Sequence, residues 1–279
     1  MYSFIVSASI SCTKDDIDHC QKKDLEELSF GFESGLEEWV ELGGQIEIKN
    51  SSFFEICSQT ANSGLNAAKF IVSPESYVNS GVRSELTFDQ QIEHGDETYY
   101  AYSFYIPMDY QDVSSLEASD GSPNWQIFGQ WHDQPDVCIG QTWDDIKGNS
   151  PPISVYYNYL KISDPAYQDI LDDPKTAEIF GFEAKWDEVS VIALVVGGET
   201  VALSEISKGK WTRLKFHIKW STDTDGFVRA WINDTNLTDG KITGITMLNS
   251  ASHYFKFGLY RNLAIPFTNH AFYDDLEIY

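Results

Sequence analysis

Short runs of β-branched and aromatic residues, separated by turn-forming residues, dominate this sequence, and helical patterns are almost absent. Most runs are bounded by Gly, Pro, Asn, Asp or Ser, which is typical of strands joined by turns. The runs cover residues 29–33, 45–48, 53–57, 67–72, 82–88, 99–106, 125–131, 153–159, 189–196, 200–203, 211–220, 226–232, 254–260 and 271–279. So many strands with so little helix predict an all-β chain that packs as two sheets.

The strand pattern continues to the C-terminus without a second domain boundary. We expect a two-sheet β-sandwich of the jelly-roll (concanavalin-like) type over residues 28–279, with a concave groove for a substrate. The DTDG stretch at 223–226 indicates a hairpin turn between two strands. The one good helical pattern, at 164–179, is interrupted by Pro174, and we expect it to lie in a long loop.

The N-terminal segment is expected to direct export. Residues 1–10 are apolar with small side chains, and Cys12 is followed closely by an acidic pair, as at a bacterial lipoprotein processing site. We predict an export or lipoprotein-type segment over 1–12, a charged tether over 13–27, and a secreted, periplasmic or outer-surface protein; a cytoplasmic protein is the alternative. Membrane contact would then come only through a lipid anchor at Cys12.

The charge balance restricts the partners of this chain. Its 43 acidic and 19 basic residues give a formal net charge of −24, which argues against nucleic acid as a partner. An acidic polymer could bind only at a local basic island, against long-range repulsion. The four cysteines follow no CxxC spacing, which argues against a zinc site and leaves any disulfide pairing open. We expect a monomer.

Three predicted strands carry polar residues on one face and apolar residues on the other, by the two-residue period of a strand. The polar faces hold Arg83 and Glu85; Gln126, Phe128, Gln130 and His132; and Tyr254, Lys256, Gly258 and Tyr260. The opposite faces hold Val82, Ser84 and Leu86; Trp125, Ile127, Gly129 and Trp131; and Phe255, Phe257 and Leu259. If the polar faces line one concave sheet, they form a groove that contains Arg83, Gln126, His132, Lys256 and Tyr260.

The same strands resemble three motifs of jelly-roll polysaccharide lyases. The matching segments are Arg83-Ser84-Glu85-Leu86, Trp125-Gln126-Ile127 and YFKFGLYR at 254–261. The resemblance covers residues 30–279; it is nearest to the heparin lyase I and glucuronan lyase group and more distant from alginate lyases. The alginate and glucuronan lyases usually carry a His two residues after the Gln, but Phe128 stands there, so the base stays open between His132 and Tyr260.

The resemblance implies β-elimination on a uronate polysaccharide of the heparin, heparan, glucuronan or alginate kind. Removal of the C5 proton requires the adjacent carboxylate to be neutralised, and Arg83, Gln126 and Lys256 offer donors for this. His132 is the best candidate base, since an ordinary imidazole is largely neutral at pH 7, and Tyr260 is the best acid. Tyr260 could act as the base instead if Lys256 and Arg261 lower its pKa.

Other residues are expected to contact the substrate without reacting. They are Glu85, Gln130, Tyr254, Arg261, Tyr100, Tyr102, Tyr157 and Asn158. Glu85 would orient Arg83. Aromatic rings stack on the apolar faces of sugars, although core packing would explain Tyr100, Tyr102 and Tyr157 equally well.

No cofactor is expected for the chemistry. Asp274 and Asp275 could hold a structural Ca²⁺, or they could form a solvated acidic turn. A non-catalytic carbohydrate-binding module, a structural adhesin and a glycoside hydrolase on a similar sandwich are the alternative functions. A hydrolase needs two carboxyl groups about 5–10 Å apart, and no strand motif places two acids on one face.

Overall fold

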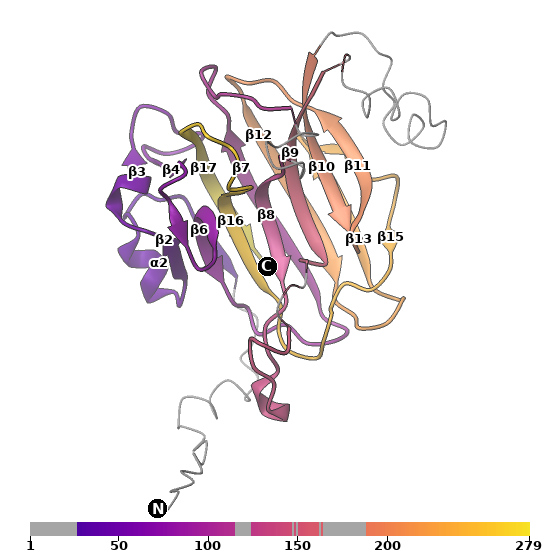
Figure 1. Ribbon diagram of the computed structural model, residues 1–279. Coiled ribbons are helices and arrows are strands. Elements are labelled where there is room, and N and C mark those ends of the chain that lie inside the picture. Colours follow the sequence, from indigo (N-terminus) through magenta and orange to yellow (C-terminus); the bar gives the residue numbers. More distant parts are fainter. Residues whose placement is uncertain (1–26, 115–123, 147, 149, 162, 164–187) are drawn as a thin grey trace, which may run out of the picture.

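Alternation of buried and exposed side chains along the strands brings two antiparallel sheets face to face (Figure 1). This computed structural model describes residues 27–114, 124–146, 148, 150–161, 163 and 188–279. In β12 (Trp211–Lys219), for example, every second residue is buried. A strand with this pattern has one face for the core and one for water, so it requires a second layer on one side only.

The first sheet is built around the central pair β7 and β17. Its order is β14 (Thr235–Asn236), β13 (Phe227–Ile232), β12, β7 (Glu97–Tyr105), β17 (Asn269–Ile278), β4 (Ala67–Val72) and β3 (Phe54–Cys57), with β1 (Leu28–Phe30) beside β17 and β15 (Ile242–Thr243) beside β13. The pairing of β12 with β13 confirms the hairpin predicted at 223–226.

The second sheet carries the strands in which the sequence placed the groove. Its order is β11 (Glu199–Glu205), β10 (Glu188–Val196), β9 (Ile153–Lys161), β8 (Gln126–His132), β16 (Tyr254–Arg261), β6 (Gly81–Phe88) and β2 (Gln45–Ile48), with β5 (Tyr77–Val78) beside β6. β8, β16 and β6 are consecutive neighbours, so the three strands predicted to form the groove lie side by side in one sheet.

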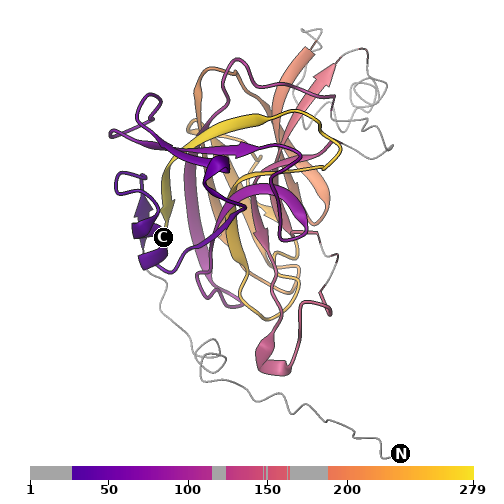
Figure 2. The same cartoon turned by 60° about the vertical axis from the view of Figure 1, so that its left-hand side comes forward.

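Helices are few and short in the described part of the chain. They are α2 (Glu37–Glu41), η1 (Ser51–Phe53) and η2 (Val137–Ile139). α2, β2 and β3 lie at one edge of the sandwich and β11 and β13 at the other (Figures 1 and 2). Within the described residues, no helix is long and apolar enough to cross a membrane.

The predicted two-sheet sandwich is confirmed, and each predicted strand range overlaps a strand of the structure. The helical pattern at 164–179 lies outside the described residues. So do the segment 1–12 with Cys12 and nearly all of the tether at 13–27. The export signal, the lipid anchor and the domain boundaries therefore stay predictions.

Aromatic side chains from both sheets fill the core. The Tyr273 ring of β17 packs against rings that include Phe70, Phe104, Phe128 and Phe257. Its hydroxyl group lies 2.6 Å from the carbonyl oxygen of Gly258 and 3.1 Å from that of Phe128, and it donates to them across the core. A buried phenol needs such an acceptor, and these carbonyls need a donor.

Both carbonyls belong to irregular stretches of the second sheet. The register of β8 on β9 shifts between Ile127 and Gly129, and the register of β16 on β8 shifts between Phe257 and Tyr260. β-Bulges of this kind leave backbone groups without a ladder partner and re-aim the following side chains. Tyr273 therefore links the first sheet to the two bulged strands of the second.

Gly258 is required by both backbone conformation and space. Its φ is +128°, and a Cβ there would lie 2.4 Å from the Ser84 carbonyl oxygen and 2.9 Å from the Glu85 Cα. We predict that Gly258→Ala lowers the free energy of unfolding by about 3 kcal/mol, measured by urea denaturation. The control is Gly240→Ala, where φ is +79° and nothing lies within 4 Å. Equal losses in the two variants would contradict this account.

Candidate active site

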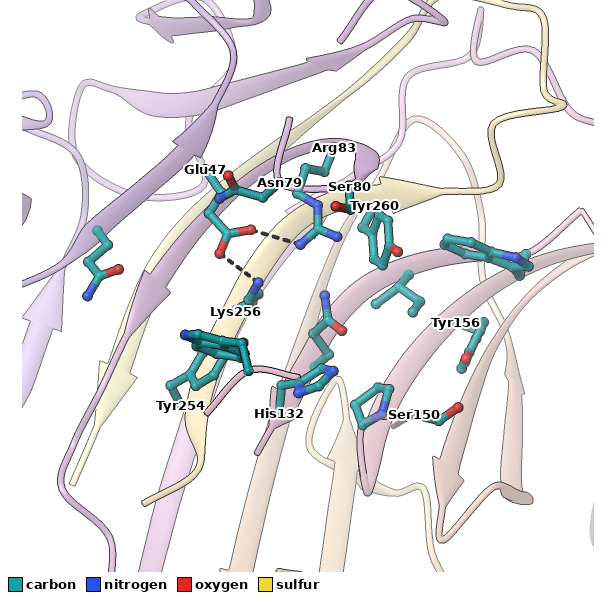
Figure 3. Close-up of a pocket in the computed structure, with 16 residues that line it drawn as sticks. Glu47, Asn79, Ser80, Arg83, His132, Ser150, Tyr156, Tyr254, Lys256 and Tyr260 are labelled. Carbon is teal, nitrogen blue, oxygen red and sulfur yellow. Dashed lines mark hydrogen bonds and ion pairs between the residues drawn. The ribbon is translucent and has the colours of Figure 1, made fainter. Parts of the chain in front are cut away.

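A groove of about 820 Å³ lies on the outer face of the second sheet (Figure 3). β2, β6, β8, β9 and β16 contribute to it, together with Asn79, Ser80, Trp125, Trp143, Ser150 and Pro151 from the connecting segments. The lining residues are Gln45, Glu47, Asn79, Ser80, Arg83, Trp125, Ile127, Gln130, His132, Trp143, Ser150, Pro151, Tyr156, Tyr254, Lys256 and Tyr260. Polar groups and aromatic rings face an open trough, as in sites that bind sugars.

The structure brings six of the predicted site residues together in this groove. They are Arg83, Gln130, His132, Tyr254, Lys256 and Tyr260. Strand pairing explains this convergence, because Tyr260 lies opposite Arg83 on β6, and Lys256 lies opposite Gln130 on β8. Glu85 lies beneath the groove, fully buried, where its Oε1 accepts a hydrogen bond of 2.7 Å from Gln130.

Gln126 does not face the groove, and the alternation predicted for β8 is wrong at this end. The Gln126 side chain is buried, and its Oε1 accepts a 2.6 Å hydrogen bond from the Tyr110 hydroxyl. Trp125 and Ile127, which were predicted on the apolar face, line the groove instead. The register shift after Ile127 is the reason, since one extra residue in a strand reverses the faces on either side of it.

The bulge also changes how the lyase motif fits this chain. Gln130 and His132 both line the groove, while Trp131 between them is buried in the core. A Gln followed two residues later by His is the arrangement that the resemblance led us to seek at Gln126 and Phe128. Gln130 and His132 have this arrangement, on the part of β8 that follows the bulge.

Several predicted substrate contacts are core residues. Tyr100 and Tyr102 lie on β7 of the opposite sheet, and both are buried. Tyr157 points into the core from β9, where its hydroxyl donates to Asp112 Oδ1 at 2.6 Å. Adjacent strand residues face opposite sides, so the groove receives Tyr156, which the sequence analysis missed.

Asn158 and Arg261 also lie away from the main groove. Asn158 lines a second hollow of about 310 Å³, which shares Trp125 and Tyr156 with the groove. The Arg261 side chain is buried below the sheet and donates to the carbonyl oxygens of Ile265 and Phe267. Burial lowers the pKa of Arg261 to about 10. Arg261 therefore holds the turn after β16 rather than the substrate.

Glu47 of β2 organises the cations of the groove. Its Oε2 accepts a 2.8 Å hydrogen bond from Arg83 Nη1, and its Oε1 accepts one of 2.7 Å from Lys256 Nζ (Figure 3). Arg83 Nη1 also lies 3.4 Å from Glu85 Oε2. We call the contacts among Glu47, Arg83 and Lys256 the Glu47 bridge. The sequence analysis missed Glu47, although the alternation within 45–48 placed it on the same face as Gln45.

The charged groups of this cluster shift one another's pKa values. Burial raises the pKa of Glu47, but Lys256 and Arg83 more than offset this, so it lies below its ordinary value. Burial lowers the pKa of Arg83, and the carboxylates of Glu85 and Glu47 raise it above the ordinary value. Burial raises the pKa of Glu85, which Arg83 and Lys256 only partly oppose. At neutral pH, Glu47 and Arg83 are thus held in their charged forms.

The phenol of Tyr260 projects between two flat groups. The Arg83 guanidinium carbon lies 4.0 Å from the centre of the Tyr260 ring, and the Trp125 ring meets it edge-on at 4.7 Å. Burial raises the pKa of Tyr260 above its ordinary value, and Arg83 opposes this only in part. The condition under which Tyr260 would serve as the base, a pKa lowered by Lys256 and Arg261, is therefore not met. Tyr260 keeps its proton at neutral pH, as a general acid must.

His132 lies at the end of β8 and is held by the next residue. Its Nδ1 lies 2.8 Å from Asp133 Oδ1 and 3.0 Å from the Asp133 carbonyl oxygen. Both contacts favour the proton on Nδ1, which leaves the Nε2 lone pair available to accept another. The Tyr254 ring stacks on the imidazole at 5.9 Å and fixes its orientation further. With its proton on Nδ1, His132 would have the tautomer that a general base needs.

Asp274 and Asp275 anchor a loop on the first sheet. Asp274 Oδ2 accepts from the backbone N–H groups of Asn62 and Ser63, and Asp275 accepts from both of their side chains. Burial raises the pKa of Asp274. The described residues contain no group of three or more His, Cys, Asp or Glu that could hold a metal ion. Calcium binding here stays a prediction that a metal titration would test.

The family model described as "Polysaccharide lyase" matches residues 33–277, almost the whole described fold. The chain belongs to this polysaccharide lyase family. It is therefore an enzyme of lyase type, as the sequence motifs predicted. No curated protein matches this lyase in sequence.

Solved structures support the fold of the lyase. An endo-β-1,4-glucuronan lyase from the fungus Trichoderma reesei is 15% identical, with a TM-score of 0.51, over 84% of this chain and 86% of that one. The alginate lyase Aly36B is 13% identical, with a TM-score of 0.53, over 90% and 96% of the two chains. A GH131 β-glucanase catalytic domain from Podospora anserina is 13% identical, with a TM-score of 0.50, over 82% and 79%. At these identities the likeness concerns the sandwich alone.

Removal of the Glu47 side chain should show how much the Glu47 bridge contributes to the free energy of unfolding. We predict that Glu47→Ala lowers the free energy of unfolding by about 3 kcal/mol, because it leaves Lys256 and part of the Arg83 charge buried without a counter-charge. Chemical denaturation at pH 7 measures this loss. Glu55→Ala is the matched control, since Glu55 forms an exposed ion pair of 3.3 Å with Lys69 and should cost less than about 1 kcal/mol. A similar cost for both would show that the groove pairs contribute no more than a surface pair.

Proposed function

We propose that this lyase cleaves a uronate-containing acidic polysaccharide by β-elimination in the groove on the second sheet. The observation that carries the proposal is the convergence of a base, an acid and cationic donors on one open surface. His132, Tyr260, Arg83 and Lys256 all line it (Figure 3). A binding module would need the rings and the cations, but it would have no use for a base held in one tautomer beside a protonated phenol.

The cationic donors act on the uronate carboxylate. Arg83 carries five N–H groups and Lys256 three, and the Glu47 bridge engages one of each. A carboxylate beside Arg83 and Lys256 is neutralised by their charges, which makes the C5 proton more acidic. The same donors stabilise the enolate-like charge that develops as this proton leaves.

The proton transfers follow from the positions of His132 and Tyr260. His132 Nε2 accepts the C5 proton, and the electron pair of the C–H bond forms the C4–C5 double bond. The bond from C4 to the bridging oxygen breaks, and the Tyr260 hydroxyl protonates that oxygen. The imidazolium of His132 then releases its proton to solvent and the phenolate of Tyr260 regains one, which restores both groups. Asp133 stabilises the imidazolium that forms, because it lies 2.8 Å from Nδ1.

The glucuronan and alginate lyases with this fold act, by their names, on uronate polymers, and this supports a uronate substrate here. The GH131 β-glucanase shows that the sandwich also occurs in hydrolases. In this groove, however, Glu47 and Glu85 both contact Arg83, and Glu85 is fully buried. Neither is placed as a free acid and base pair.

Ultraviolet absorbance distinguishes the reaction classes. We predict that incubation with heparin, heparan sulfate, glucuronan, alginate or ulvan gives a product with a C4–C5 double bond, which absorbs, from at least one polymer. New reducing ends without absorbance would indicate a hydrolase. Retardation of a polymer in a gel, without any product, would indicate a binding module.

Two substitutions test the assigned roles. Tyr260→Phe and His132→Ala should each lower kcat by about 100-fold or more, since each removes one proton transfer. Tyr105→Phe and His270→Ala are matched controls on the opposite sheet and should retain activity. Circular dichroism checks that all four variants fold. Full activity of Tyr260→Phe or His132→Ala would remove that residue from the mechanism.

The raised pKa of Tyr260 gives an expectation for the pH profile. A phenol whose pKa lies above its ordinary value keeps its proton at higher pH, so it remains able to protonate the leaving oxygen. We predict that kcat shows no decline due to Tyr260 below about pH 10. A decline near pH 8 that disappears in Tyr260→Phe would contradict this assignment.

A further inference from the structure

Within the part of the chain that the structure describes, the groove carries very little positive charge for a site that receives an acidic polymer. Arg83 and Lys256 supply the fixed cations among its 16 lining residues. Glu47 contacts both of them, and Glu85 contacts Arg83 from below. Glu47 and Glu85 thus already engage these cations before any substrate arrives, which reduces the positive charge that the cluster presents.

The two cations are also poorly accessible. The Arg83 side chain is 9% exposed and the Lys256 side chain 5% exposed. The Glu47 bridge and the ring of Tyr260 cover them, with Arg83 lying 4.0 Å from the centre of that ring. Apart from Arg83 and Lys256, the described lining residues offer a second or third anionic group on the same sugar no further fixed cation.

The described residues that line the continuation of the groove across β9 and β10 carry no charged side chain. The hollow of about 310 Å³ is lined by Trp125, Ser150, Pro151, Ser154, Tyr156, Asn158, Ala193, Val195, Gly198 and Thr200. It shares Trp125, Ser150, Pro151 and Tyr156 with the main groove, so a bound chain of sugars would pass from one to the other. Indole, phenol, amide and hydroxyl groups suit a sugar ring with free hydroxyl groups.

We propose that this lyase selects an unsulfated uronate polysaccharide, and that Glu47 is the residue that sets this preference. The inference rests on the proposed function and narrows its substrate class. A sulfate ester is negatively charged at every pH used in an assay. In this groove it would lie beside the carboxylate of Glu47 or beside uncharged lining residues. Like charges brought together at a binding surface disfavour the wrong partner. The net charge of −24 adds repulsion that grows with the charge density of the polymer.

Matched polymers test the preference. Heparosan is compared with heparan sulfate, and glucuronan and alginate with their chemically sulfated forms, in the absorbance assay with the wild-type protein. In every pair that is cleaved, the unsulfated member should have a kcat/KM at least about tenfold higher. A higher kcat/KM for the sulfated member would overturn the inference and leave the proposed function intact. A double-bond product from none of the polymers would overturn the proposed function itself.

The substitution Glu47→Gln tests whether the charge of Glu47, rather than its size, sets the substrate preference. The amide keeps the size of the carboxylate and can still accept a hydrogen bond from Lys256, but it frees one unit of positive charge in the groove. The ratio of kcat/KM for the unsulfated member to that for the sulfated member should fall at least threefold, and added salt should reduce this change. A loss of activity from distorted packing would lower both values and leave the ratio in place.

Glu55→Gln is the control for this experiment. It removes the same charge from the exposed end of an ion pair on β3, in the other sheet. Its ratio should equal that of the wild type. An unchanged ratio in Glu47→Gln, or an equal change in Glu55→Gln, would show that Glu47 does not set the preference.

Discussion

The hydroxyl group of Tyr273 holds the geometry on which this site depends. It donates across the core to the carbonyl oxygens of Phe128 and Gly258, at the two places where β8 and β16 leave regular register. These irregularities decide which side chains reach the outer face. Without them, strict alternation would put Gln126 in the groove. A phenol in the core of the sandwich thus determines which residues meet the substrate on its surface.

The second determinant of the site is electrostatic, and it comes from a different part of the chain. Glu47 joins Arg83 and Lys256 through contacts of 2.8 and 2.7 Å. It keeps both cations oriented toward the cavity and also limits the positive charge they present. The groups to which we assign the proton transfers, Tyr260 and His132, are in turn contacted by Arg83 and Asp133. Residues next to Tyr260 and His132 therefore provide the contacts that orient them and the carboxylate that balances the cations.

The sequence predicts the architecture well, because alternation and turn residues are local signals. It also predicts Arg83, Lys256 and Tyr260 correctly as neighbours, since regular pairing of β6 and β16 preserves the faces. It fails at Gln126, where a bulge inserts a residue that no local pattern reveals. It also misses Glu47, whose contact with Lys256 spans 209 residues of sequence. Pairings over such a distance depend on the order of the strands, which alternation does not encode.

The position of β2 has a consequence for how such an enzyme can change. β2 is the last strand of its sheet, with β6 as its neighbour, and it carries Glu47 but none of the groups assigned to proton transfer. Substitutions in an edge strand disturb fewer neighbours than substitutions in a central one. Under the proposals above, a charge-changing substitution on this peripheral strand would alter the charge of the groove while the groups assigned to proton transfer stay on β8 and β16.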